Sequence, residues 1–200
     1  MLQAASIRGL VAARKGRDWC LFLDRDGVIN RQVVGDYVRR WQQFEWLPGA
    51  VPALRMLREW APHLVVVTNQ QGIGKGLMST DDVAAIHQRL QSQIACEGRE
   101  IDSFQVCPHL ESSGCRCRKP QPGLVLDWLA QHPEVDPSLS IVVGDSLVDL
   151  RLAEMVAAAT GGCASVQIGG ARLPATADAS FDSLWDFAAA LEHGMGKLDR

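Results

Sequence analysis

The sequence predicts an α/β fold with an open parallel sheet and helices on both of its faces. Five short runs of β-branched or large apolar residues recur along the chain, and helical patterns fill the gaps between them. Such alternation is typical of right-handed βαβ crossovers, which build parallel sheets. The run 64–67 shows no polar alternation, as expected of a strand that is covered on both faces.

Each predicted element has a local signal in the chain. We expect strands at residues 19–23, 64–67, 101–106, 141–143 and 164–168. We expect helices at residues 50–60, 80–96, 122–131, 147–159 and 182–193. Pro52 suits the first turn of its helix. Ser79 followed by Asp82 predicts a capping arrangement at the start of another helix.

Length and composition indicate one domain. The chain has 200 residues, of which 47% are hydrophobic and 22% charged, which is enough for a sizeable core. We place the domain at residues 18–193, between an N-terminal tail at 1–17 and a C-terminal tail at 194–200. The N-terminal segment is basic and weakly resembles a transit peptide, but we favour a frayed or partly helical tail.

The charge balance narrows the choice of partners. A net charge of −3 and a pI of about 5.9 give no basic surplus for nucleic acid or an anionic membrane. No apolar run approaches the roughly 18 residues that span a bilayer. We therefore expect a cytoplasmic monomer that binds neither nucleic acid nor membranes.

Two carboxylates, Asp24 and Asp26, directly follow the first predicted strand, and Gly27 allows the chain to turn away after them. In open α/β sheets, ligands bind outside the carboxyl ends of the strands. A pair of acids there suits a divalent cation or acid/base chemistry. The alternative is a strand followed by an ordinary Asp-Gly turn.

Polar groups also follow the second and fourth strands and occupy the loop between the third and fourth. They are Thr68-Asn69-Gln70, Arg118-Lys119-Pro120, and Gly144-Asp145-Ser146 with Asp149 further on. Parallel strands bring these groups to one edge of the sheet. Phosphoryl transfer from a monoester needs such carboxylates, hydroxyl and cations together. Taken singly, each segment could be a turn or a solvated charge.

Together these four segments resemble the motifs of the haloacid dehalogenase superfamily of phosphatases, in the family's order and over about residues 19–165. The resemblance implies a Rossmann-like fold. It implies that Asp24 is the nucleophile, Asp26 the general acid/base, Thr68 a ligand of the phosphoryl group and Lys119 its stabilising cation. It implies that Mg²⁺ is held by Asp24, Asp145 and the main-chain carbonyl of Asp26. Asp149 is expected to orient Lys119 rather than bind the metal.

The six cysteines fall into two groups. Three are isolated and predicted to be core thiols: Cys20, Cys96 and Cys163. The others share a short loop with a histidine: Cys107, His109, Cys115 and Cys117. A Cys₃His set is typical of structural zinc and leaves no open position for water. A labile disulfide at Cys115 or a redox switch is the alternative.

The cysteine loop indicates a particular branch of the superfamily. The loop leads into Arg118-Lys119 and would hold those cations over the cleft. Cys-Pro-His followed by Cys-x-Cys-Arg-Lys-Pro is similar to a capless, zinc-containing branch with heptose bisphosphate and histidinol-phosphate phosphatases. Only about 40 residues separate Gly27 from Thr68, and they leave no room for a lid domain. The resemblance thus implies a capless Mg²⁺-dependent phosphatase for a small phosphate ester.

Two substrates stay open. The segments 35–38, 44–49 and 68–76 are similar to the heptose branch and favour heptose 1,7-bisphosphate. The short zinc loop is closer to the histidinol branch, and Val28 stands where many superfamily members have Thr. As substrate-binding residues we expect Asn69, Arg118 and Lys75, with Arg39 or Arg40 as a further candidate for a second phosphate.

Other functions fit less well. An acidic pI and the lack of a basic stripe argue against a phosphatase for nucleic-acid 3′ ends. A non-catalytic zinc-bearing module would be marked by a missing catalytic acid, and none is missing. A phosphomutase would need to exclude water from the phospho-aspartate, which a capless site does poorly.

Overall fold

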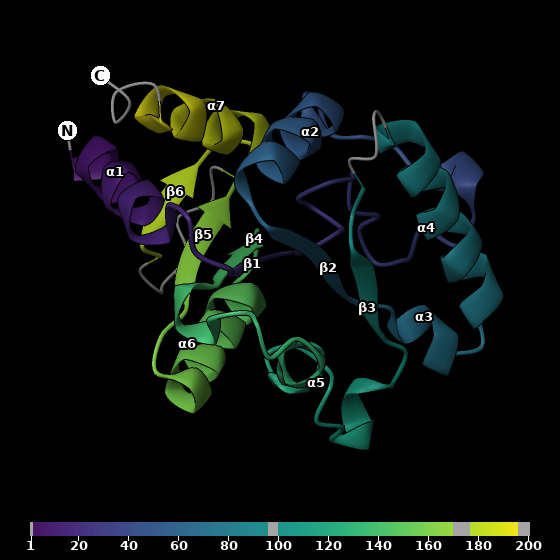
Figure 1. The fold of residues 1–200 in the computed structure, drawn as a ribbon. Coiled ribbons are helices and arrows are strands. Elements are labelled where there is room, and N and C mark those ends of the chain that lie inside the picture. Colours follow the sequence, from purple (N-terminus) through teal and green to yellow (C-terminus); the bar gives the residue numbers. More distant parts are fainter. Residues whose placement is uncertain (1, 96–99, 170–176, 196–200) are drawn as a thin grey trace.

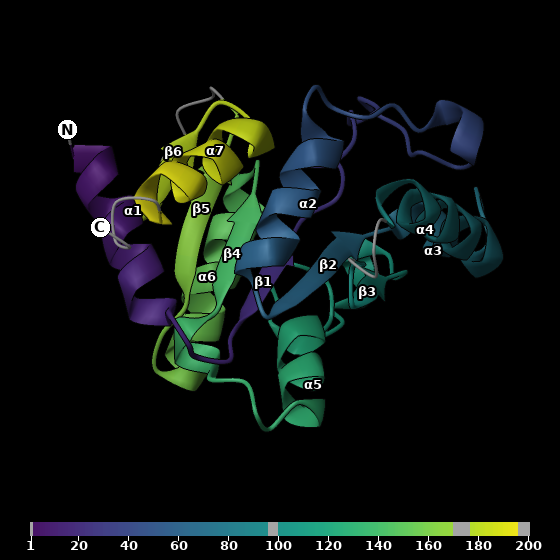
Figure 2. The ribbon, with the colours of Figure 1, turned by 45° about the horizontal axis from the view of Figure 1, so that its top comes forward.

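The computed structural model describes residues 2–95, 100–169 and 177–195 and contains a parallel sheet between two layers of helices (Figures 1 and 2). The strand order is β3-β2-β1-β4-β5-β6, and every neighbouring pair is parallel. The strands are β1 (Cys20–Leu23), β2 (His63–Asn69), β3 (Ser103–Cys107), β4 (Ile141–Gly144), β5 (Ala164–Ile168) and β6 (Ala179–Phe181). The predicted α/β class is confirmed.

The helices lie on both faces of the sheet, as predicted. They are α1 (Leu2–Arg14), α2 (Ala50–Trp60), α3 (Gln71–Gly74), α4 (Thr80–Ile94), α5 (Gly123–Gln131), α6 (Leu147–Thr160) and α7 (Leu184–Met195). Figure 1 shows α1, α2 and α7 on one side of the sheet and α5 and α6 on the other. At the start of α4, Ser79 and Asp82 form the predicted capping box. No helix in the described part of the chain is long and apolar enough to cross a membrane.

The core has two halves because side chains alternate across the sheet. Leu21 and Leu23 of β1 belong to the cluster that packs under α1, α2, α4 and α7. Cys20 and Phe22 belong to the cluster under α5 and α6, beside Trp128. Both faces of β1 are therefore buried, which explains why its sequence is apolar without alternation.

The N-terminal segment, expected to be a frayed or partly helical tail, forms a helix that packs on the domain. Residues 2–14 form α1, which packs against α7, and Ile7 and Val11 are buried in the main core. The Arg14 Nε donates a hydrogen bond to the carbonyl oxygen of Leu139, 2.6 Å away. Ile7 and Val11 are four residues apart and therefore lie on one face of the helix. This helical spacing was not recognised in the sequence because basic residues surround it. At the other end α7 runs to Met195, and the rest of the predicted C-terminal tail lies outside the described residues.

Two short elements were not predicted. Strand β6 has only three residues, too few for a recognisable alternation, and it is defined by its pairing with β5. Helix α3 occupies a glycine-rich segment for which no helix was predicted. A side chain at Gly74 would place its Cβ 2.8 Å from the carbonyl oxygen of Pro108, so glycine permits the close contact between α3 and the cysteine loop.

The connections match the predicted capless arrangement. Between β1 and β2 the described chain forms loops, one 3₁₀ turn (Trp41–Gln43) and α2. Between β2 and β3 it forms only α3 and α4. Among the isolated cysteines, Cys20 is buried and Cys163 is half-buried, whereas Cys96 lies outside the described residues.

Candidate active site

The candidate site lies where the strand order reverses. Strands β1 and β4 are neighbours, and their onward connections lead to opposite sides of the sheet. Such a switch point opens a crevice at the carboxyl ends of the strands, where ligands bind in open α/β sheets. A cavity of about 270 Å³ is found there. Its walls include Asp24, Asp26, Tyr37, Thr68, Asn69, Gln70, Arg118, Lys119, Asp145 and Asp149.

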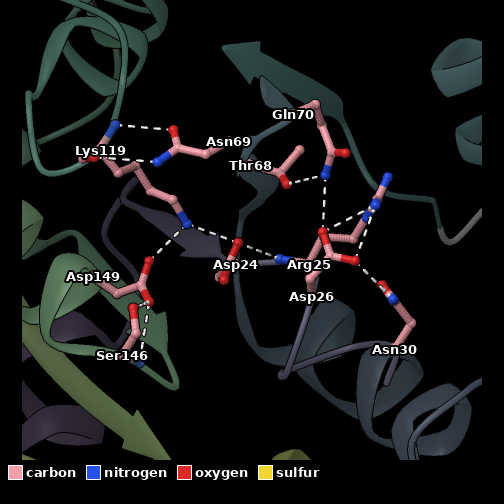
Figure 3. A network of polar contacts seen from close by, with 10 residues as sticks. All are labelled: Asp24, Arg25, Asp26, Asn30, Thr68, Asn69, Gln70, Lys119, Ser146 and Asp149. Carbon is pink, nitrogen blue, oxygen red and sulfur yellow. Dashed lines mark hydrogen bonds and ion pairs between the residues drawn. The ribbon is translucent and has the colours of Figure 1, made fainter. Parts of the chain in front are cut away.

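A buried lysine lies between two carboxylates. The Lys119 Nζ is 2.7 Å from Asp24 Oδ1 and 2.6 Å from Asp149 Oδ1, and its side chain is only 4% exposed (Figure 3). Burial alone would lower the pKa of Lys119, but Asp149 and Asp24 outweigh it and raise the pKa above the ordinary value. The ammonium is therefore charged, and it pairs with Oδ1 of Asp24.

Asp149 has both of its oxygens engaged. One accepts from Lys119, and the other accepts from the main-chain N–H and the hydroxyl of Ser146 (Figure 3). These bonds to Ser146 form the capping box that begins α6. A Cβ at Gly144 would collide with the Asp149 side chain, so glycine is required at the end of β4. This geometry agrees with the prediction that Asp149 orients Lys119.

Asp24 and Asp145 approach each other across the switch point. Oxygens of Asp24, Asp145 and Asp149 all lie within 4.8 Å of one another. Burial, and then the neighbouring Asp149, raise the pKa of Asp145 to about 6. Burial also raises the pKa of Asp24 to about 7, although Lys119 opposes that shift. Buried acids so close together favour a cation between them, and oxygen donors of this kind suit Mg²⁺.

Gly27 allows Asp145 to approach. Its φ angle is +93°, a backbone conformation that L side chains rarely adopt. A Cβ at this position would also collide with the carboxylate of Asp145. The glycine after the two aspartates therefore both turns the chain and leaves space for the third acid.

Asp26 is held by side chains that the sequence did not single out. Its carboxylate accepts from Arg25 at 3.0 Å, from Asn30 at 2.9 Å and from Gln70 at 2.9 Å (Figure 3). Burial alone would raise the pKa of Asp26, but the charge of Arg25 and these hydrogen bonds lower it. Arg25 and Gln70 stand inside motifs that were recognised, yet nothing in the sequence indicates which way their side chains point.

His87 completes this group from α4. Its Nε2 lies 3.2 Å from Arg25 Nη1, and its ring stacks on Phe104 with centroids 4.3 Å apart. Burial, and then the charge of Arg25, lower the pKa of His87 to about 3. The ring is therefore neutral, with Nε2 as the acceptor. The sequence did offer one indication that His87 is buried: it follows Val83 by four residues and so lies on the apolar face of α4.

Thr68 and Asn69 have different surroundings, although they are adjacent at the end of β2. The buried Thr68 hydroxyl accepts a hydrogen bond from Gln70 at 2.8 Å and lines the cavity. Asn69 was predicted to bind substrate, but its amide bonds at both ends to the main chain of Lys119. Asn69 also lines the cavity, so it supports the loop that carries the lysine, and its substrate-binding role stays a prediction.

The predicted phosphate-binding cations lie at different depths. Arg118 lines the cavity, and its buried Nη1 has no hydrogen-bond partner among the described residues. Lys75 is exposed and lies outside that wall, with its Nζ 5.3 Å from the centre of the Tyr37 ring. Arg39 and Arg40 border an adjoining hollow of about 370 Å³, and Arg39 pairs with Asp36 at 2.6 Å. Of these cations, only Arg118 enters the main cavity.

The cysteine loop gathers its four predicted ligands. The Sγ atoms of Cys107 and Cys115 lie 3.7 Å apart, and Cys117 Sγ is 3.4 Å from each of them. The His109 Nδ1 lies 3.1 Å from Cys117 Sγ and 3.7 Å from Cys107 Sγ. A tetrahedral site with metal–sulfur bonds of about 2.3 Å separates its ligands by slightly less than 4 Å. The cluster could therefore hold a metal ion, and these three thiols are not joined by disulfides.

Comparisons with known proteins agree with this geometry. No family model matches the chain. A curated relative from Mycobacterium tuberculosis, named D-glycero-alpha-D-manno-heptose-1,7-bisphosphate 7-phosphatase, is 69% identical over 188 residues, which are 94% of this chain and 99% of the relative. A Bordetella bronchiseptica relative, named for the beta anomer, is 39% identical over 154 residues, which are 76% of this chain and 82% of the relative.

A solved structure gives the same result for the fold. The D,D-heptose 1,7-bisphosphate phosphatase of B. bronchiseptica, crystallised with magnesium and phosphate, has a TM-score of 0.76 and 32% identity to this chain. The match covers 88% of this chain and 98% of that one. Fold and site together define a phosphatase of the haloacid dehalogenase superfamily. Within it, the chain belongs to the heptose-1,7-bisphosphate 7-phosphatase family.

Proposed function

We propose that this phosphatase removes the 7-phosphate of D-glycero-α-D-manno-heptose 1,7-bisphosphate. The observation that carries the substrate is the 69% identity, over nearly the whole of both chains, to a relative named for that reaction. We propose the α anomer because the 69% identical relative is named for it. The Bordetella relative, which is named for the β anomer, is only 39% identical. Histidinol phosphate remains the alternative because of the short cysteine loop.

The proposed reaction has two steps. A carboxylate oxygen of Asp24 attacks phosphorus, and the bond from phosphorus to the sugar oxygen breaks while Asp26 gives that oxygen a proton. Water then attacks the aspartyl-phosphate, Asp26 takes the proton of the water, and inorganic phosphate leaves with Asp24 regenerated. The position of Asp24 at the end of β1, 2.7 Å from Lys119, supports its role as nucleophile.

Charge on the transferring group must be offset by cations. Lys119, already charged beside Asp24, would stabilise the phosphoryl oxygens, and the Thr68 hydroxyl would bind one of them. We assign the carboxylates of Asp24 and Asp145 and the main-chain carbonyl of Asp26 to Mg²⁺, which would neutralise charge on the phosphate when bound. The shared crevice and raised pKa values of these acids support that assignment.

The second phosphate of the substrate needs its own cation. Arg118 suits this role because its Nη1 is buried at the cavity wall and has no partner among the described residues. A guanidinium can bind phosphate oxygens in a bidentate way. Lys75 and Arg39 or Arg40 lie further out, where they would attract the bisphosphate toward the cavity.

The test is phosphate release from the α and β anomers of the bisphosphate and from histidinol phosphate. We expect the α anomer to give the highest kcat/KM, with release lost in EDTA and in an Asp24→Asn variant used as the blank. A preference for the β anomer would correct the anomer, and a preference for histidinol phosphate would establish the alternative. No release from any of the three by folded protein would reject both named substrates.

We also propose that the cluster of Cys107, His109, Cys115 and Cys117 binds structural zinc. Four protein ligands at these separations leave no position for a reactive water. Because the loop continues directly into Arg118 and Lys119, the metal would hold both cations in place.

The zinc proposal predicts a change in metal content. Purified native protein should contain stoichiometric zinc, and Cys117→Ser should lose most of it, since one thiolate is removed from the set. Metal analysis by mass spectrometry measures this directly. Cys163→Ser is the matched control, because Cys163 is half-buried away from the loop and should leave the zinc content unchanged. Native protein without zinc, or full zinc in Cys117→Ser, would contradict the assignment.

A further inference from the structure

Arg25 separates the two catalytic aspartates in sequence but points into the protein. Its side chain is fully buried, with Nη2 about equally close to both oxygens of Asp26, at 3.0 and 2.9 Å. Its Nη1 lies 3.2 Å from Nε2 of His87 on α4. Arg25 therefore bridges the neutral His87 ring and the carboxylate of Asp26.

Two further donors complete the hold on Asp26. Asn30 Nδ2 donates to Oδ1 and Gln70 Nε2 donates to Oδ2, each at 2.9 Å (Figure 3). Gln70 also donates to the Thr68 hydroxyl at 2.8 Å. The orientation of Asp26 is thus tied to the residue proposed to bind the phosphoryl group. The Asp26 side chain keeps 22% exposure, and it lines the cavity.

Stability alone is a poor reason for this network. Three of its buried atoms have no hydrogen-bond partner among the described residues: Arg25 Nε, Asn30 Oδ1 and Gln70 Oε1. A buried guanidinium is also costly to remove from water, and an apolar replacement of a buried ion pair is often neutral or stabilising. What the network does provide is a single direction for the Asp26 carboxyl group.

We propose that Arg25, held by His87, is a positioning residue that aims the Asp26 carboxyl group at the leaving oxygen of the phosphate ester. The inference rests on the proposed role of Asp26 as general acid. Proton transfer needs the carboxyl group within hydrogen-bond reach of that oxygen in a fixed direction. Arg25 is fully buried and does not line the cavity, so in this proposal it acts through Asp26.

A positioning role and a merely structural role predict different effects of the leaving group on the reaction rate. Departure of p-nitrophenolate needs little help from an acid, whereas a sugar alkoxide needs a proton. We would measure the single-turnover release of the leaving group, with enzyme in excess and Mg²⁺ present. The substrates are p-nitrophenyl phosphate, mannose 6-phosphate and heptose 1,7-bisphosphate. The first step is thereby observed apart from hydrolysis of the aspartyl-phosphate.

Arg25→Lys keeps the charge but cannot hold Asp26 and His87 together. It should slow sugar release at least about tenfold at saturating enzyme, yet slow p-nitrophenol release less than about threefold. Asp26→Asn should show the same pattern with a larger loss. Arg14→Lys is the matched control, since Arg14 is a mostly buried arginine with main-chain bonds far from the site. It should leave the ratio of the two rates unchanged.

Contrary outcomes are equally clear. Equal slowing of both leaving groups, or a changed half-saturation with an unchanged maximal rate, would overturn the positioning role. If Arg25→Lys does not fold, His87→Gln provides the second variant, and it should shift the ratio in the same direction by a smaller factor. If native protein turns over the other esters but not heptose 1,7-bisphosphate, the proposed substrate fails while the ratio still tests Arg25.

Discussion

An Asp24→Asn variant should lose phosphatase activity by a factor of at least about 10⁴, because an amide cannot act as the nucleophile toward phosphorus. The substitution keeps the size of the side chain and removes one proposed ligand of Mg²⁺. It should not unfold the protein. The buried Lys119 would keep its second carboxylate partner, Asp149, at 2.6 Å, so its charge would not be left unpaired.

Two measurements check the Asp24 prediction. Steady-state phosphate release gives the loss of activity, and rapid acid quenching with radiolabelled substrate should trap phosphoenzyme in the native protein only. Asp136→Asn is the control: Asp136 pairs with Arg17 at 2.9 Å near the amino end of β4, away from the site. Activity within tenfold of native in Asp24→Asn would remove Asp24 from the role of nucleophile.

A Lys119→Met variant should lose about 3–5 kcal/mol of folding stability, measured without Mg²⁺. It should also lose most of its phosphatase activity, measured with Mg²⁺. Methionine fills a similar volume, but it leaves Asp24 and Asp149 buried without their shared cation. The cost is that of uncompensated buried charge. Urea unfolding monitored by fluorescence, at neutral pH in EDTA, measures the free energy of unfolding.

The Lys119 prediction has two internal checks. Adding Asp149→Asn to Lys119→Met should recover part of the lost stability, because one of the two unpaired carboxylates is then neutral. Lys75→Met, at an exposed lysine, should change the unfolding free energy by no more than about 0.5 kcal/mol. A Lys119→Met variant as stable as native would mean that the carboxylates have another source of charge compensation.

Much of the site could be predicted because it depends on local sequence and on a general property of parallel sheets. Apolar runs locate β1 and β4, and the residues that follow them must meet at the same edge. Asp24 and Asp145 are therefore close together in any fold of this class. The cysteine cluster was equally accessible, since Cys107 and Cys117 are near neighbours in the chain.

The contacts that the sequence analysis did not predict join residues far apart in the chain. Asn69 lines the cavity, but its hydrogen bonds to the main chain of Lys119, 50 residues further on, were not predicted. The N-terminal segment was expected to be a frayed or partly helical tail, and its packing against α7 was not predicted either. No local pattern reports a contact of this kind.

The amino-acid sequence was enough to locate β1 to β5, the order of the motifs, and the types of residue that reach the carboxyl edge of the sheet. These follow from apolar periodicity and from the fixed alternation of side chains along a strand. The partners of the buried polar atoms at the site depend on contacts between distant parts of the chain. Arg25 turns inward because His87, 62 residues away in the chain, is buried beside it. A buried polar group takes its orientation from the partners that replace water, and folding alone brings those partners together.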